Sequence, residues 1–202
     1  MAAPTPPAAL LLTGGASRRM GRDKASLIVA GQRLAVRTAA LLTDVAAPII
    51  EVGPGYTALA QVQESPAGGG PLAALAAGWA GLVERGLPES ASVLVVATDM
   101  PRLTVGLLAL LARHPRPGCV VPLDHEGRSQ PLCARYPMAT LARATNLVGA
   151  GQRSIHALLD LGGENVTWLT PSAWQQAAGR PDALVDVDTP ADLAALNIRA
   201  DA

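Results

Sequence analysis

Short apolar runs alternate with segments of helical periodicity along most of this chain, and this alternation limits the fold more than any other feature. Apolar runs of strand length lie at Ala8–Leu12, Pro48–Val52, Val93–Ala97 and Gly118–Val121. Apolar residues recur at helical spacing in Leu34–Thr43, Pro71–Glu84 and Thr104–Arg113. The order predicts an α/β fold: a single-domain, three-layer sandwich with a mostly parallel central sheet and helices on both faces.

Length and charge narrow the classes of function. The chain has 202 residues with 16 Lys and Arg against 16 Asp and Glu, so we expect one domain over residues 1–202, with residues 1–7 as a flexible N-terminus. A neutral chain without a basic run offers no footprint for duplex nucleic acid. No apolar stretch approaches the ~20 residues of a membrane span, and the N-terminus lacks the positive region of a signal peptide. We therefore expect a cytoplasmic protein that binds neither nucleic acid nor membrane.

The first apolar run ends in a glycine-rich, basic loop. The segment Leu10–Lys24 contains the adjacent glycines Gly14 and Gly15, the adjacent arginines Arg18 and Arg19, and finally Lys24. Glycines let a backbone approach a ligand closely, and arginine and lysine supply positive charge for phosphate oxygens. The spacing fits neither a P-loop nor the G-x-G-x-x-G fingerprint. The pattern favours a loop that holds a polyphosphate, and the alternative is a surface turn with solvated arginines.

Asp99 directly follows the apolar run Val93–Ala97 and Thr98. In parallel α/β sheets, ligands bind beyond the carboxyl ends of the strands. A carboxylate there can hold Mg²⁺, which usually takes one or two carboxylates together with substrate phosphates and water. On position alone, an aspartate that caps a turn before Pro101 explains the residue equally well.

Two further segments contain residues typical of turns directly before a predicted helix. Gly68–Leu72 places three glycines before a helix, whose N-terminus favours negative charge, although a flexible connector would look the same. In Val185–Leu193, Thr189 or Asp188 is a suitable N-cap with Pro190 at the first helical position, and this structural role is sufficient by itself.

The basic loop strongly resembles the signature of the molybdenum cofactor guanylyltransferases and their nucleotidyltransferase relatives, which reads roughly L-A-G-G-x-S-x-R-M-G-x-D-K. Here Thr13 stands where alanine is usual, and the matching residues are Leu12, Gly14, Gly15, Ser17, Arg19, Met20, Gly21, Asp23 and Lys24. Asp99-Met100-Pro101 is similar to the family's D-x-P, and Gly70-Pro71-Leu72 to its G-P-L, which is preceded by an acidic slot that Glu64 or Ser65 would fill. Val185–Leu193 resembles N-x-N-T-P-E-D-L, with Asp186 and Asp188 in place of the two asparagines.

The resemblance implies a Rossmann-like fold of the nucleotide-diphospho-sugar transferase type and a transfer of GMP from GTP to the molybdopterin-bound molybdenum cofactor, with release of pyrophosphate. It implies Arg18, Arg19, Lys24 and Asp99 as catalytic residues, with Asp99 as the ligand of a Mg²⁺ cofactor. The implied nucleotide-binding residues are Leu12, Thr13, Gly14, Gly15, Lys24, Gly70, Pro71, Asp99, Asp186 and Asp188. The implied partners are GTP and the molybdenum cofactor, with transient contact to cofactor-delivery proteins or molybdoenzymes, and we expect a monomer.

Two alternatives stay open. Aspartates at positions 186 and 188 also occur among related cytidylyltransferases, so the nucleotide could be CTP, with molybdopterin or a sugar phosphate as acceptor. The glycine pair Gly14-Gly15 resembles the guanylyl group more than the Ala-Gly of the cytidylyl group, and this favours GTP. A non-catalytic nucleotide-binding delivery protein is the second alternative, and the intact Asp99 and Lys24 argue against it.

Overall fold

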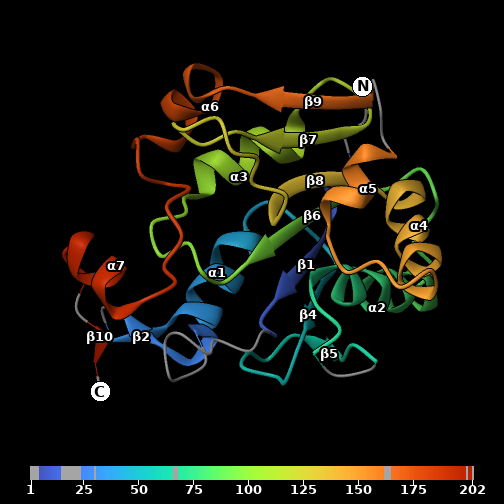
Figure 1. The fold of residues 1–202 in the computed structure, drawn as a ribbon, viewed down its shortest axis with the longest axis horizontal. Helices are drawn as coiled ribbons and strands as arrows, with labels where there is room; N and C mark the ends of the chain where they lie inside the picture. The colour runs from blue at the N-terminus through green and yellow to red at the C-terminus, as the bar shows by residue number, and fades with distance from the viewer. Residues whose placement is uncertain are drawn as a thin grey trace.

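The computed structural model describes residues 5–14, 24–29, 31–65, 68–161, 165–198 and 200–201. These residues form a central seven-stranded sheet in the order β5-β4-β1-β6-β8-β7-β9 (Figure 1). Its strands are β1 (Ala8–Leu12), β4 (Ile49–Val52), β5 (Ala60–Val62), β6 (Ser92–Ala97), β7 (Cys119–Pro122), β8 (Cys133–Pro137) and β9 (Val166–Leu169). Strand β8 runs antiparallel to β6 and β7, and the other neighbouring pairs are parallel. The predicted α/β fold with a mostly parallel sheet is confirmed.

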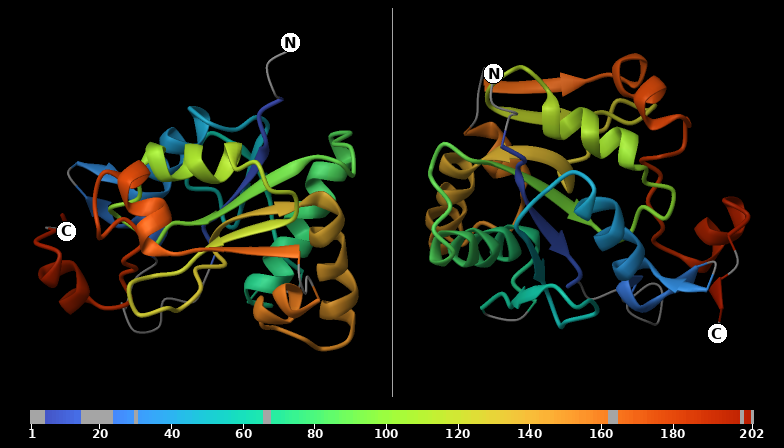
Figure 2. Two further views of the ribbon diagram at one scale, coloured as in Figure 1. Left: turned by 90° about the horizontal axis from the view of Figure 1, so that it is seen from above. Right: turned by 180° about the vertical axis from the view of Figure 1, so that it is seen from behind.

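Helices cover both faces of this sheet (Figure 2). They are α1 (Leu34–Thr43), α2 (Pro71–Glu84), α3 (Val105–Arg113), α4 (Met138–Gly149), α5 (His156–Asp160), α6 (Pro171–Ala178) and α7 (Pro190–Ala195), with a short 3-10 helix η1 (Lys24–Ser26). Helices α1 and α2 have the predicted bounds, whereas α3 begins one residue late because Thr104 is its N-cap and accepts a hydrogen bond from Leu107 N–H. Across the part of the chain that the structure describes, no helix is both long and apolar enough to cross a membrane.

Two apolar cores lie on opposite faces of the sheet because side chains alternate along each strand. Leu10 and Leu12 of β1 pack toward α2, α4 and α5, whereas Ala9 and Leu11 pack toward α1, α3 and α6. All five residues of β1 are buried. Burial on both faces explains why the inner strands read as uninterrupted apolar runs rather than as alternating ones.

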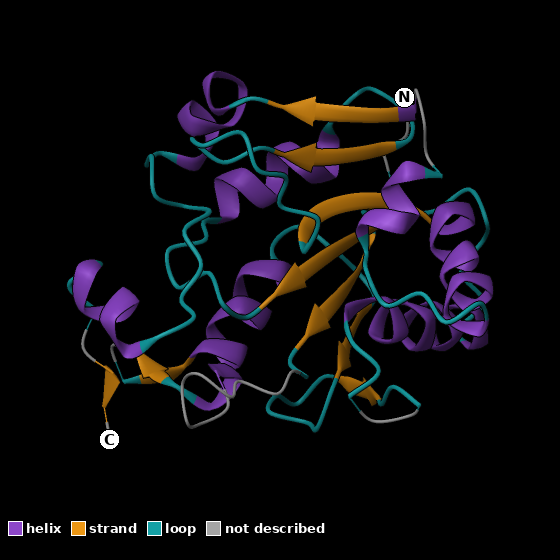
Figure 3. Ribbon diagram, viewed as in Figure 1, coloured by secondary structure: helices purple, strands orange, loops and turns teal. Residues whose placement is uncertain are grey.

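A second, three-stranded sheet joins the C-terminus to an N-terminal segment (Figure 3). Its strands are β2 (Ile28–Val29), β3 (Gln32–Arg33) and β10 (Ala200–Asp201). Each is two residues long, so no apolar run in the sequence predicts them. A small core that includes Leu27 and Val187 lies beside it. This core brings Val187, which lies between Asp186 and Asp188, next to Leu27, which lies three residues after Lys24.

Of the N-terminal residues 1–7, for which flexibility stays a prediction, the structure describes residues 5–7. Pro7 is buried, and its carbonyl oxygen accepts a hydrogen bond from Ala47 N–H at 2.9 Å. Residues 1–4 lie outside the described residues.

The order of the strands determines where a ligand can bind. Strand β1 lies between β4 and β6. From β1 the chain passes through α1 to β4 on one side, and it reaches β6 on the other side only after β5 and α2. Such a reversal of strand order opens a crevice beyond the carboxyl ends of the two strands, here β1 and β6.

Candidate active site

The carboxyl ends of β1 and β6 place two of the predicted segments side by side. Leu12 of β1 pairs with Ala97 of β6, so Thr13-Gly14 and Thr98-Asp99 leave the sheet together. Leu12 and Thr13 are buried, and Gly14 is exposed. The N–H groups of Thr13 and Gly14 both donate to Val52 C=O, at 3.0 and 3.3 Å. The backbone of this corner is therefore held by β4, and the N–H groups of Thr13 and Gly14 already have a partner in the sheet.

Lys24 lies between two carboxylates at this edge of the sheet. Its Nζ is 3.9 Å from Asp99 Oδ2 and forms a closer ion pair with Asp188. The side chains of Lys24 and Asp99 are only 16% and 27% exposed, so the pair is partly shielded from solvent. The structure thus brings together three residues that the sequence placed far apart, and all three were predicted for the site.

The surroundings of Asp99 disfavour the ionised form of its carboxyl group. Burial raises the pKa of the Asp99 carboxyl, and the neighbouring carboxylates of Asp186 and Asp188 raise it further against the opposing charge of Lys24. A carboxylate in such surroundings is suited to bind a cation. The positive charge would offset both the desolvation cost of the ionised carboxylate and its repulsion by the neighbouring carboxylates.

These carboxylates could hold Mg²⁺ if substrate phosphates and water supplied the remaining ligands. In the described ranges no group of three His, Cys, Asp or Glu side chains is arranged to hold a metal ion. Mg²⁺ does not require such a group, because it is usually bound through one or two carboxylates, substrate phosphates and water. Asp99, with Asp186 or Asp188 beside it, matches that donor set.

Glu64, rather than Ser65, faces the glycine corner. Glu64 Oε2 would lie 3.8 Å from a Cβ atom placed on Gly14, and Glu64 Oε1 accepts a hydrogen bond from Gly68 N–H at 2.9 Å. Ser65 instead lines a surface groove along α2. The structure therefore identifies Glu64 as the acidic residue near the loop.

The start of α2 lies close to a basic side chain from a distant loop. Gly70 is the N-cap of α2 with φ +91°, and Pro71 is the first helical residue. Arg153 Nη2 donates to Gly68 C=O at 2.8 Å, and Arg153 C=O would lie 3.7 Å from a Cβ atom on Gly70. The glycine-rich connector is thus supported by the Arg153 loop that precedes α5.

Three predicted site residues, Gly15, Arg18 and Arg19, lie outside the described residues. Their expected roles toward phosphate therefore stay predictions. Near the C-terminus, Thr189 is the N-cap of α7 and Pro190 its first residue, and the side chain of Asp192 completes a capping box. The predicted structural role of this segment is confirmed, with Thr189 rather than Asp188 as the cap.

Sequence reasoning missed two residues that support the site. Arg102, three residues after Asp99, donates to Asp182 Oδ2 and to Leu196 C=O, which ties the C-terminal segment to the end of β6. Glu51 is fully buried inside the apolar run Pro48–Val52, and it accepts hydrogen bonds from the Thr13 hydroxyl and from the loop after β4. A carboxylate within a buried run was the available signal for Glu51, because buried charges require partners.

Residues 9–167 match the MobA-like NTP transferase domain. The chain belongs to this family. The probable molybdenum cofactor guanylyltransferase of Mycobacterium tuberculosis is 36% identical over 163 residues, which cover 77% of this chain and 80% of that protein. A protein of the same name from Chloroflexus aggregans is 30% identical over 198 residues, 91% of this chain and 90% of its own length. As a MobA-like NTP transferase the chain is a nucleotidyltransferase, which confirms the predicted class of enzyme.

Solved structures show that this MobA-like NTP transferase shares its fold with other nucleotidyltransferases. The molybdopterin-guanine dinucleotide biosynthesis protein A of Archaeoglobus fulgidus superposes with a TM-score of 0.72 at 20% identity, over 93% of this chain and 95% of that one. The 2-C-methyl-D-erythritol 4-phosphate cytidylyltransferase of Thermus thermophilus gives 0.64 at 20% identity, over 95% and 97%. Both likenesses concern the fold, and they confirm the predicted nucleotide-diphospho-sugar transferase type.

Proposed function

We propose that the protein transfers GMP from GTP to the molybdopterin-bound molybdenum cofactor, forming the guanine dinucleotide cofactor and releasing pyrophosphate. The observation that carries the proposal is the cluster of Lys24, Asp99 and Asp188 at the carboxyl ends of β1 and β6, where a nucleotide triphosphate would lie. The guanylyltransferase names of the two relatives, at 36% and 30% identity, support the choice of nucleotide and acceptor.

The proposed chemistry is an in-line displacement at the α-phosphorus of GTP. A terminal phosphate oxygen of the acceptor forms the new P–O bond, and the bond to the leaving pyrophosphate breaks. Such catalysis consists mainly of positioning and of neutralising charge. Lys24 would contact the triphosphate, and Arg18 or Arg19 would meet charge on the pyrophosphate. Mg²⁺, held by Asp99 with Asp186 or Asp188 beside it, would neutralise negative charge on the phosphates.

Glu64 supports guanine as the base. Guanine carries two adjacent donors, N1–H and the 2-amino group, and the two oxygens of a carboxylate can accept both. Cytosine offers one amino donor flanked by an acceptor nitrogen, which a carboxylate would repel. Because Glu64 lies beside Gly14, a base stacked at this corner would present its edge to a carboxylate.

The function is tested by measuring pyrophosphate release with GTP, CTP, ATP and UTP, each with Mg²⁺ and molybdenum cofactor. We expect release with GTP that requires the cofactor as acceptor, together with formation of the guanine dinucleotide. Faster release with CTP would assign the protein to the cytidylyl enzymes, as the paired Asp186 and Asp188 suggest. Nucleotide binding without any release of pyrophosphate would instead indicate a delivery protein.

A further inference from the structure

Glu51 is a buried carboxylate that collects five hydrogen bonds. Its Oε1 accepts from Thr13 Oγ1 at 2.7 Å, from Gly55 N–H at 3.1 Å and from Tyr56 N–H at 2.6 Å. Its Oε2 accepts from Thr57 N–H at 2.9 Å and from Thr57 Oγ1 at 2.6 Å. These bonds hold the pKa of Glu51 below its usual range although burial alone would raise it, so the group is ionised at neutral pH.

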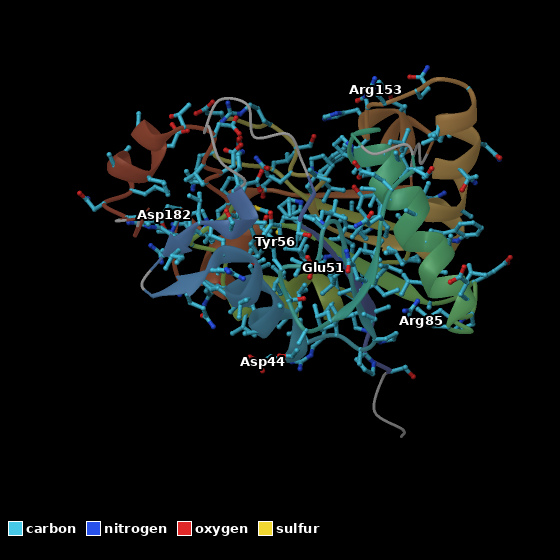
Figure 4. All side chains as sticks on the ribbon, turned by 90° about the horizontal axis from the view of Figure 1, so that it is seen from below. Asp44, Glu51, Tyr56, Arg85, Arg153 and Asp182 are labelled. Atoms are coloured by element: carbon cyan, nitrogen blue, oxygen red, sulfur yellow. The ribbon has the colours of Figure 1, made fainter. Side chains whose placement is uncertain are left out.

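The contacts of Glu51 join two chain segments that meet at the nucleotide corner. Thr13 directly follows β1, whereas residues 55–57 belong to the loop after β4, and the labelled side chains of Glu51 and Tyr56 lie near each other (Figure 4). The two segments approach very closely: a Cβ atom on Gly53 would lie 2.3 Å from Thr13 Oγ1 and 2.6 Å from Gly14 N. The position of Thr13 is therefore set by the loop after β4, and the Cα of Gly53 in turn lies 3.7 Å from a Cβ atom placed on Gly14.

Thr13 and Glu51 are also chemically complementary, as hydrogen-bond donor and acceptor. Thr13 stands where the family signature has alanine, and an alanine could not donate to a carboxylate. A buried charge is costly unless its hydrogen-bonding capacity is met. The Thr13 hydroxyl therefore supplies one of the hydrogen bonds that the buried Glu51 carboxylate requires, which an alanine at position 13 would not do.

We infer that Glu51 is a positioning residue for the nucleotide, acting through the hydroxyl of Thr13 and the amides of residues 55–57 to hold the Gly14 corner in its binding geometry. The inference rests on the proposed function, since it concerns how the nucleobase side of that site is built. Sites that place a ligand accurately need a supporting layer that fixes the contacting backbone, and here a single carboxylate supports both segments. Glu51 itself does not touch the nucleotide in this assignment.

The test compares GTP affinity by calorimetry in Thr13→Val, Thr13→Ser and Glu51→Gln with that of the wild-type protein. Valine keeps the shape of threonine but removes the donor, and we expect GTP binding to weaken about fivefold or more, the effect of about one lost hydrogen bond. Serine keeps the hydroxyl and should restore most of the affinity. Glu51→Gln should weaken binding further and speed hydrogen exchange at the amides of Gly55, Tyr56 and Thr57, a readout that needs no nucleotide.

A control separates positioning from general loss of stability. Leu111 is fully buried in the core on the α3 face, and Leu111→Ala should lower the melting temperature without changing GTP affinity. Wild-type affinity in folded Thr13→Val would overturn the inference, and this variant decides the matter even if Glu51→Gln does not fold. A wild-type protein that binds no GTP would instead refute the proposed function, while faster exchange in Glu51→Gln would still show the role of Glu51 in the loop.

Discussion

The backbone N–H of Val187 donates to the carbonyl oxygen of Asp99 at 2.9 Å. This hydrogen bond fixes the C-terminal segment against the end of β6 and thereby holds Asp186 and Asp188, on either side of Val187, near the Asp99 carboxylate. Lys24 from the N-terminal part of the chain then pairs with Asp188. The acidic and basic groups of the site are therefore assembled by backbone pairing as well as by charge.

Replacing Lys24 with alanine should weaken nucleotide binding and turnover together, because the ammonium group contacts phosphate in both the ground state and the transition state. Loss of one charge-assisted contact costs about 1.5–3 kcal/mol, or about 10- to 150-fold in affinity. Calorimetric binding of GTP with Mg²⁺ and steady-state kinetics measure the two effects. Arg85→Ala is a matched control, because it also removes one positive charge. Arg85 is the C-cap of α2, at the end of that helix opposite Gly70, and Figure 4 shows it well away from Glu51 and Tyr56, which lie on the nucleotide side. An unchanged KM and kcat in Lys24→Ala would exclude this role.

Replacing Asp99 with asparagine should nearly abolish turnover while the fold survives. The change keeps the shape and one oxygen, but it removes the charge that would hold Mg²⁺ beside the phosphates. Pyrophosphate release over a Mg²⁺ titration, together with a thermal melt, gives both readouts. If Asp99 only caps a turn, asparagine should serve almost as well, since both residues suit such positions. Wild-type-like turnover would therefore end the metal-binding claim.

The same substitution should stabilise the protein in the absence of nucleotide and Mg²⁺. The pKa of Asp99 is raised in the folded protein above its ordinary value of 3.8, so the folded state binds this proton more tightly than the unfolded chain does. The stability contributed by the protonated form is complete below pH 3.8 and is lost as the pH rises through the folded pKa. At neutral pH the ionised carboxylate is thus a cost, and we expect Asp99→Asn to melt at a higher temperature than the wild type.

Melting temperatures measured from about pH 3.5 to about pH 8 would show this linkage. The advantage of the asparagine variant should be largest at neutral pH and should shrink as the pH falls toward 3.8. A variant that is less stable than the wild type at neutral pH would mean that attraction between Asp99 and Lys24 outweighs burial and repulsion.

Replacing Gly14 with alanine should reduce the preference for GTP over CTP. We expect the wild type to prefer GTP by at least about tenfold, or roughly 1.4 kcal/mol. The Cβ atom of an alanine would meet protein atoms only at 3.7 Å and beyond, which is ordinary contact, so the fold should tolerate it. A lower GTP affinity in this variant would then mean that the added methyl group takes up space that the purine needs. Side-by-side titration of GTP and CTP measures the ratio, and an equal preference in the wild type would contradict the expectation.

Local patterns in the sequence were sufficient for the helices and strands that carry long apolar periodicities. Helix α2 has the bounds that Pro71 at its start and Gly86 beyond its end predict, and β1 coincides with the run Ala8–Leu12. The ends of β1 and β6 could be placed at one edge of the sheet because strand order in such folds directs ligands there. The two-residue strands β2, β3 and β10 could not be predicted, because their pairing depends on contacts between distant parts of the chain.

By itself, the sequence determined the fold class and the family signature and predicted Lys24 and Asp99 for the site, since each rests on residue types at short spacing. Only the tertiary structure decided which groups meet. Lys24 pairs with Asp188 across 164 positions, and Thr13 donates to Glu51 across 38. Partners at such separations leave no periodic pattern, because a hydrogen bond or an ion pair depends on atoms within a few ångströms and not on their order along the chain.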